Sequence, residues 1–312
     1  MQLFITRRAL VRGLASGAAV LASLALSISA AQARTSVVAA IPELAAIAKE
    51  VGGDDVDVYS IAKSNQDYHA IETRPSDVAR LSHASLVIRI GLGFDPWMVS
   101  LSSAAGNTAI KPGGSAYVDA SAGIPVIEMP NEQISGASGD VHPEGNPHYY
   151  YDPIYAVFAA RNIAKGLIRV DGAHAAAYRA GYARFNADMR RRVSGWQSTL
   201  APYRGKRVVT YHRNYNYFLR RFGLAQGGTM EPRPGIPPSA KHINALLATM
   251  KAQGTRAILI EGIYPLRYPN VVAKAVGSRA VVGPYSVASL SQGAYAAMID
   301  KLVDAARQAM SS

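Results

Sequence analysis

Residues 173–200 read AHAAAYRAGYARFNADMRRRVSGWQSTL, and this stretch limits the architectures that the chain can adopt. It is rich in helix-forming residues, and its large apolar residues recur at spacings of three and four, which predicts a helix with one buried face. A helix of about 28 residues is long, since the mean is about 11–12. At 1.5 Å per residue it would extend roughly 40 Å, enough to join two lobes. The apolar stripe consists of Tyr178, Tyr182, Phe185, Met189, Val193 and Trp196.

On both sides of this helix the sequence alternates between strand signals and helical stretches. Such alternation implies crossover connections and a mainly parallel sheet in each half. We therefore expect an α/β protein with two α/β lobes, residues 34–172 and 203–312, linked by a long helix over 173–202. Strands are expected near residues 35–40, 56–60, 85–90, 125–127, 207–211, 257–261 and 280–283, and further helices near 41–51, 153–170 and 293–309.

Residues 1–33 have the features of an export signal. Arg7, Arg8 and Arg12 precede a short apolar stretch of small residues, and an A-x-A motif at residues 31–33 supplies a cleavage site. The mature chain is therefore expected to begin at Arg34. A membrane-spanning helix would need roughly 20 strongly apolar residues, which this stretch does not have. The paired arginines fit the twin-arginine route and the general secretory route equally.

The chain contains no cysteine, which excludes disulfide bonds, thiolate ligands, a cysteine nucleophile and lipid attachment at a cysteine. A cleaved, unlipidated exported protein fits the bacterial periplasm best, with secretion into the medium as the alternative. Removing residues 1–33 takes away three arginines and no acid, so the net charge falls from +12 to +9. Because the basic residues are scattered and the chain is expected to be exported, nucleic acid is not an expected partner.

Three histidines in separate parts of the chain are the candidate functional residues: His69, His148 and His212. His69 follows a strand and a polar turn, His212 comes directly after a strand, and His148 stands in a turn that leads into a helix. In open parallel sheets ligands bind at the carboxyl ends of the strands, so these side chains can face one crevice. Three imidazoles suit zinc better than magnesium or calcium. A single histidine is more often a surface or core residue, so the surrounding motifs decide the interpretation.

Those motifs are spread over nearly the whole mature chain. Residues 67–69 read DYH, residues 91–97 GLGFDPW, residues 145–153 GNPHYYYDP and residues 231–239 EPRPGIPPS. Together they resemble the metal-binding receptors of zinc and manganese ABC transporters, the ZnuA-like and TroA-like periplasmic solute-binding proteins. The stretch 145–153 is the most specific part of this resemblance.

The resemblance implies two α/β lobes with mainly parallel sheets, joined by one long rigid helix. It also implies that a metal ion is held in the cleft between the lobes. Transferred residue by residue, it implies that His69, His148 and His212 are the metal ligands.

The chain departs from the family pattern at two places. Tyr68 stands where the family usually has proline, a change that can loosen the turn before the first ligand. Many members also supply a carboxylate ligand from a late aspartate, but residues 282–287 read VGPYSV and offer none. The candidates for the fourth position are Glu261, Glu231 and a water molecule. His142 is close enough in sequence to assist at the cleft mouth, but its surroundings favour a solvated loop residue.

The resulting hypothesis is a monomeric binding protein, not an enzyme. It would capture a divalent transition metal, Zn²⁺, in the periplasm and deliver it to a membrane ABC permease with a cytoplasmic ATPase. Mn²⁺ is the less favoured ion, because harder ions prefer oxygen ligands. A zinc hydrolase that uses three histidines and an activated water is the main alternative, although the sequence has no HExxH or GxSxG motif. A manganese receptor or a metal-binding adhesin is the third possibility.

Overall fold

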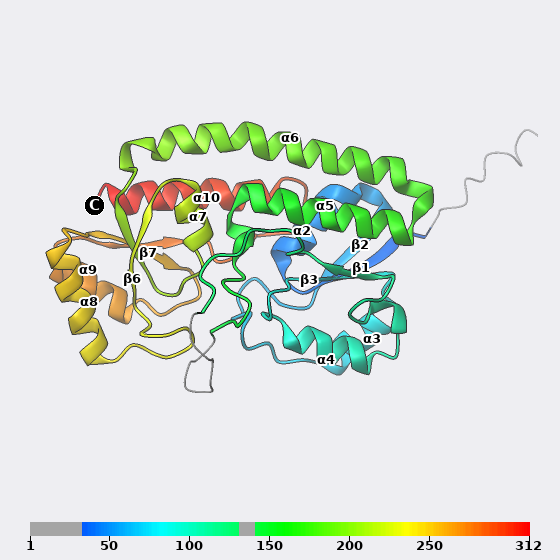
Figure 1. Ribbon diagram of the computed structural model, residues 1–312, viewed down its shortest axis with the longest axis horizontal. Helices are drawn as coiled ribbons and strands as arrows, with labels where there is room; N and C mark the ends of the chain where they lie inside the picture. Colours follow the sequence, from blue (N-terminus) through cyan, green and yellow to red (C-terminus); the bar gives the residue numbers. More distant parts are fainter. Residues whose placement is uncertain (1–32, 131–140) are drawn as a thin grey trace, which may run out of the picture. The chain divides into compact units, whose positions relative to one another are not determined.

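The computed structural model of the chain describes residues 33–130 and 141–312 (Figure 1). The export signal is predicted over residues 1–33, of which residues 1–32 lie outside the described residues. Within the described part, no helix is both long enough and apolar enough to cross a membrane.

Two parallel β-sheets with the same strand order form the framework of residues 35–312 (Figure 1). The first sheet has the order β2-β1-β3-β4, the second has the order β6-β5-β7-β8, and every strand pair in them is parallel. The chain has no sequence repeat, yet the two sheets have the same topology. The strands are β1 (Thr35–Ala39), β2 (Val56–Ser60), β3 (Leu86–Arg89), β4 (Tyr117–Asp119), β5 (Arg207–Thr210), β6 (Ala225–Thr229), β7 (Ala257–Glu261) and β8 (Ala280–Gly283).

Helices connect these strands and join the two halves. The helices are α2 (Pro42–Gly52), α3 (Pro75–Ser82), α4 (Pro96–Ala104), α5 (Pro153–Val170), α6 (Ala175–Leu200), α7 (Asn216–Arg221), α8 (Ala240–Ala252), α9 (Arg267–Ala275) and α10 (Ala294–Met310). We call the first sheet with its helices, α5 included, the first lobe, and the second sheet with α7 to α10 the second lobe. The predicted fold class, two α/β lobes joined by a long helix, is confirmed.

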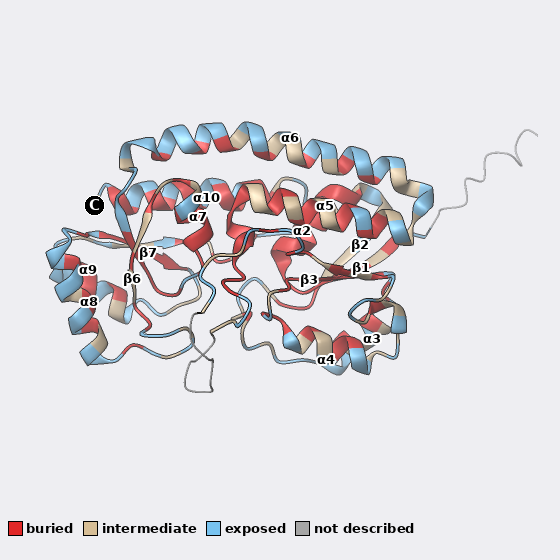
Figure 2. Cartoon of the chain, in the orientation of Figure 1, coloured by how far each residue is buried: buried red, intermediate tan, exposed pale blue. Residues whose placement is uncertain are grey.

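The long helix α6 contacts helices of both lobes. It packs against α2 and α5 of the first lobe and against α10 of the second (Figure 1). Five of the six residues of the predicted stripe are buried, and the sixth, Tyr182, is half-buried, while the opposite face of the helix is exposed (Figure 2). The larger hydrophobic core continues from Val37 in β1 to Met310 in α10, so the two lobes share one core. A smaller core forms between the second sheet and helices α8 and α9. Because a shared core cannot slide without losing buried contacts, it holds the lobes in register.

The strand predicted at residues 125–127 is wrong. Pro125 has no backbone N–H, and the Ile127 N–H donates to the Tyr217 hydroxyl at 3.3 Å instead of to a strand. The Ile127 carbonyl accepts the Asn146 N–H at 2.9 Å, so this segment supports the turn before His148. The sheet is completed by β4, which the sequence reading missed. It also missed β6, whose two glycines weaken the strand signal.

Two glycines of α6 provide a matched test of its packing. A Cβ at Gly181 would lie 2.0 Å from the carbonyl oxygen of Val51 in α2, whereas a Cβ at Gly195 would meet nothing within 4 Å. We predict that Gly181→Ala lowers the free energy of unfolding by about 1–3 kcal/mol, because it forces the helices apart. Gly195→Ala should raise it by up to about 1 kcal/mol through helix propensity. Urea unfolding of the metal-free protein measures both changes, and equal effects at the two positions would contradict close packing at Gly181.

Candidate metal centre

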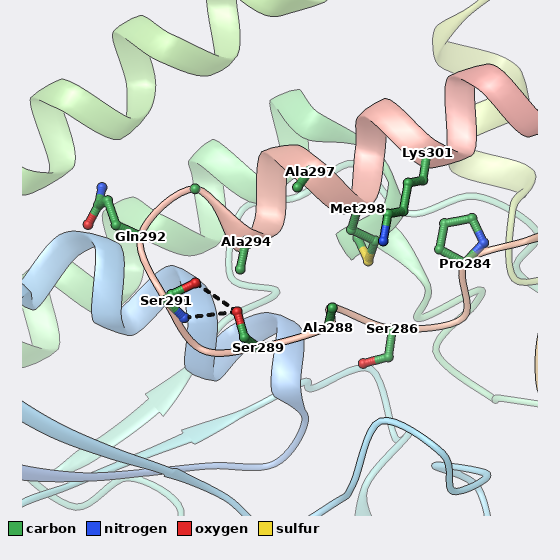
Figure 3. A pocket seen from close by; sticks show the side chains of 11 residues that line it. Pro284, Ser286, Ala288, Ser289, Ser291, Gln292, Ala294, Ala297, Met298 and Lys301 are labelled. Carbon is green, nitrogen blue, oxygen red and sulfur yellow. Dashed lines mark hydrogen bonds between the residues drawn. The ribbon is translucent and has the colours of Figure 1, made fainter.

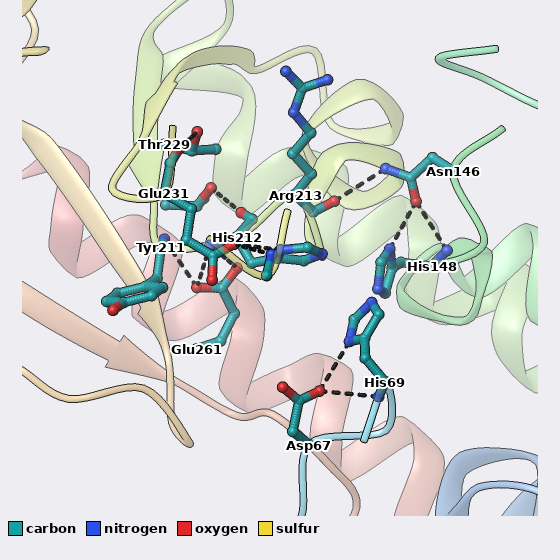
Figure 4. A network of polar contacts seen from close by, with 12 residues as sticks. Asp67, His69, Asn146, His148, Tyr211, His212, Arg213, Thr229, Glu231 and Glu261 are labelled. Atoms are coloured by element: carbon teal, nitrogen blue, oxygen red, sulfur yellow. Dashed lines mark hydrogen bonds and ion pairs between the residues drawn. The ribbon is translucent and has the colours of Figure 1, made fainter. Parts of the chain in front are cut away.

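Loops that follow strands of both sheets bring His69, His148 and His212 together (Figure 4). His69 lies in the loop after β2, His212 lies two residues beyond β5, and His148 precedes the short 3₁₀ turn at Tyr149–Tyr151. One nitrogen from each imidazole lies within 4.8 Å of the others. Two of these side chains therefore come from the chain before α6 and one from the chain after it.

The spacing of the three rings fits a single metal ion. Their ring centres are 5.0 Å apart for His69 and His212, 5.2 Å for His148 and His212, and 5.5 Å for His69 and His148. With Zn–N distances of 2.0–2.1 Å, imidazoles arranged tetrahedrally around zinc would have ring centres about 5 Å apart. The arrangement can hold an ion of this size with only small shifts. We call these residues the three-histidine group.

His69 and His148 are held by the same local device. In each case the residue two positions earlier, Asp67 or Asn146, uses one side-chain oxygen to accept two hydrogen bonds from the histidine. Asp67 Oδ1 lies 3.0 Å from the His69 backbone nitrogen and 2.9 Å from its Nδ1. Asn146 Oδ1 lies 2.9 Å from both the backbone nitrogen and Nδ1 of His148. A turn of this kind orients the ring through local contacts alone.

The hydrogen bonds of Asn146 determine which nitrogen of His148 is available. The Asn146 amide nitrogen donates to Glu128 Oε2 at 2.9 Å and to the Arg213 carbonyl at 3.1 Å, so its oxygen faces His148 as an acceptor. Nδ1 of His148 must therefore carry the proton, and Nε2 presents its lone pair. The Nε2 atoms of His69 and His148 are buried and have no hydrogen-bond partner among the described residues. Burial lowers the pKa of His148 well below its usual range, aided by repulsion from His212, so this imidazole is neutral at neutral pH.

Two glutamates hold His212 in place through hydrogen bonds. Glu231 Oε2 lies 2.8 Å from His212 Nδ1, and the Glu261 carboxylate accepts the backbone N–H groups of Tyr211 at 3.0 Å and His212 at 3.3 Å (Figure 4). Burial raises the pKa of Glu261 to about 8. Among the described residues, the ligand atoms that lie within 4.8 Å of one another belong to the three histidines, and Glu231, Glu261 and His142 lie outside this set. Glu231 contacts the His212 ring and Glu261 accepts its backbone N–H, so both carboxylates considered for the fourth position contact His212 itself.

His142 and Phe94 also lie at this centre; from the sequence His142 could assist at the cleft mouth, but a solvated loop residue was favoured, and Phe94 was given no role. The favoured interpretation of His142 is wrong: the residue is half-buried, its ring lies 5.4 Å from that of His69, and burial lowers its pKa to about 3. Phe94 packs against His69 at 4.6 Å, His142 at 5.2 Å and His148 at 5.4 Å. Phe94 stands in the GLGFDPW motif, which was recognised, but the motif does not reveal what the ring touches.

Tyr68 is tightly held and does not loosen the turn before His69. Its backbone N–H donates to the Tyr285 hydroxyl of the second lobe at 3.1 Å, and its carbonyl accepts the Trp97 indole N–H at 3.2 Å. Its own hydroxyl donates to Glu43 Oε1 at 3.3 Å. The residue that replaces proline therefore ties the His69 loop to both lobes.

A separate pocket of about 210 Å³ lies between residues 284–293 and the first turns of α10 (Figure 3). Its lining contains small and polar side chains together with Lys301, but no histidine or carboxylate among the described residues. It therefore lacks the donors that a transition metal requires.

The motifs around this centre agree with the comparison with known proteins. The family model described as "Zinc-uptake complex component A periplasmic" matches residues 37–309. The chain belongs to this family. The family resemblance inferred from the sequence motifs is thus confirmed.

Individual relatives of this zinc-uptake component A family share about a quarter of their residues with the chain. A putative metal-binding protein of Treponema pallidum is 25% identical over 248 residues, covering 78% of this chain and 76% of that protein. The manganese ABC transporter substrate-binding lipoprotein PsaA of Streptococcus pneumoniae is 24% identical over 237 residues, covering 74% and 73%. The crystal structure of ZnuA superposes with a TM-score of 0.74 at 24% identity, covering 89% of this chain and 100% of that one. The chain is a metal-binding substrate-binding protein of the ABC transporter type, and members of this family are not enzymes.

Removal of the Asp67 acceptor should weaken metal binding by this chain. We predict that Asp67→Ala lowers zinc affinity about 10- to 100-fold, because the His69 ring loses the group that orients it. Asp67→Asn should retain most of the affinity, since an amide oxygen already serves His148 in this way. Competition with a chromophoric zinc chelator measures both variants, with Asp57→Ala on the exposed side of β2 as the control. Equal affinities for Asp67→Ala and wild type would contradict this role.

The buried Glu43 should make stability depend on pH. Burial raises its pKa from 4.5 to about 7, so the folded state keeps a proton that the unfolded state releases between these values. Its stabilising contribution is therefore lost as the pH rises from 4.5 to 7. We predict that Glu43→Gln stabilises the protein by on the order of 3 kcal/mol above pH 7 and has little effect below pH 4.5. Urea unfolding on both sides of this window tests the prediction, with the exposed Glu72→Gln as control, and a pH-independent effect would contradict it.

Proposed function

We propose that this chain is the periplasmic receptor of a zinc uptake system. It captures Zn²⁺ and delivers it to a membrane ABC permease that works with a cytoplasmic ATPase. The observation that supports zinc is the donor set: three imidazoles converge with their Nδ1 atoms held by side-chain oxygens, which leaves nitrogen atoms to face the ion. Nitrogen-rich sites suit zinc, whereas Mn²⁺ prefers carboxylate oxygen.

The choice of metal has to come from this chain's own residues, because its relatives differ. They include a zinc-binding protein, a manganese receptor and an iron receptor. In this chain Asp67 and Glu231 contact imidazoles, so their negative charges act on the ion through His69 and His212. A carboxylate in this position makes the imidazole a better donor. The two charges also offset the charge of a divalent cation without adding oxygen ligands, which supports zinc over manganese.

The proposed location of the receptor rests on its sequence. We propose a monomer exported by a cleaved signal over residues 1–33. Since the chain has no cysteine, it would be free in the periplasm, unlike the relatives described as lipoproteins. The hydrolase alternative is not favoured, because its candidate base, Glu261, is engaged with the backbone N–H groups of Tyr211 and His212.

Calorimetric titration of the metal-stripped mature protein with Zn²⁺ and Mn²⁺ tests this function. We expect one tight zinc site per chain and weak manganese binding. His148→Ala should reduce zinc affinity more than the loss of roughly 10- to 100-fold that is typical when a residue that only orients a metal ligand is replaced. His83→Ala, at an exposed position in the first lobe, is the matched control. Tight manganese binding would contradict the zinc preference, and the absence of a tight site, or an unaffected His148→Ala, would contradict the receptor function.

A further inference from the structure

His142 shares one structural feature with two of the proposed ligands. Its Nε2 atom is buried and has no hydrogen-bond partner in the described part of the chain, as is true of the Nε2 atoms of His69 and His148. Buried polar atoms in folded proteins nearly always have a partner. The three rings that carry these nitrogens lie 5.4–6.2 Å apart, so one bound ion is a candidate partner for all of them.

The His142 ring lies against the three-histidine group. Its centre is 5.4 Å from that of His69, which is within the range found inside the group, and 6.2 Å from that of His148. The rings of the group are 5.0–5.5 Å apart. His142 lies outside the set of ligand atoms within 4.8 Å of one another, so binding to a shared ion requires a change in its side-chain torsion angles. Phe94 contacts the rings of His69, His142 and His148, so it forms one wall beside all three.

The backbone also ties His142 to the group. The His142 carbonyl accepts the Gly145 N–H at 3.1 Å, so a closed turn leads directly to Asn146. Beside this turn is the loop that carries Phe94: a Cβ at Gly93 would lie only 3.5 Å from the Glu144 side chain. His142 thus lies on the turn that leads to His148 and beside the loop whose Phe94 contacts the His69 ring.

We propose that His142 is the fourth donor to the transported ion, in the position for which Glu261, Glu231 and water were the candidates. This inference rests on the receptor function proposed above. A fourth imidazole completes a tetrahedral set of four nitrogens, which suits Zn²⁺ and disfavours Mn²⁺. His142 then determines metal specificity as well as affinity.

The test compares wild type with His142→Ala in the zinc-loaded mature protein. X-ray absorption at the zinc edge counts the imidazoles bound to the ion, and this count should fall from four to three. Competition titrations should show a loss of zinc affinity of about 10- to 100-fold. Manganese affinity should change less, so that the preference for zinc over manganese falls. His83→Ala should match wild type in all these measurements.

His148→Ala, measured in parallel, separates the two proposals. If it abolishes tight zinc binding while His142→Ala keeps the wild-type imidazole count and affinity, the role of His142 is overturned and the receptor function stands. If His148→Ala binds zinc as tightly as wild type, the receptor site itself is overturned. A lower affinity of His142→Ala with an unchanged imidazole count would show that His142 only supports the turn, and would also overturn its role as a donor.

Discussion

A metal ion bound by residues from both halves of a chain requires those halves to stay in register. Metal–ligand distances vary by only about 0.2 Å, so any looseness between the lobes would weaken binding. Two of the three histidines precede α6 and the third follows it. The shared core, the contacts of α6 with both lobes and the bond between Tyr68 and Tyr285 all serve this requirement.

Each imidazole of the three-histidine group has a hydrogen-bond partner that orients its ring. Asp67 and Asn146 act over two residues, whereas Glu231 acts from the end of a neighbouring strand. In all three cases a side-chain oxygen holds Nδ1, and the Nε2 atoms of His69 and His148 are buried without a partner among the described residues. Two of these partners are carboxylates, and they contact imidazole nitrogens. The balance between nitrogen and oxygen ligands is what distinguishes zinc from manganese sites.

This arrangement lowers the stability of the metal-free protein. Glu43 and Glu261 are buried with raised pKa values, and several imidazole nitrogens have no partner among the described residues. Local conflicts of this kind concentrate at functional sites and are offset by the rest of the fold. Here a core that extends through both lobes provides the compensation, and a bound cation would satisfy the imidazole nitrogens.

Much of this could be predicted from the sequence, because the signals are local. Periodicity and turn residues predicted the long helix and most strands, and strand-end positions predicted that His69 and His212 could meet. The segment at 125–127 was misjudged because its hydrogen bonds go to Tyr217 and Asn146, far away in the sequence.

The sequence alone thus determined which donors exist and which strand ends and turns carry them. Only the tertiary structure decided how they are used: that Glu231 and Glu261 contact His212, and that His142 lies beside His69. The physical reason is that these placements depend on contacts between segments separated by tens of residues. No local pattern records such contacts, because each is formed only when both sheets are in place.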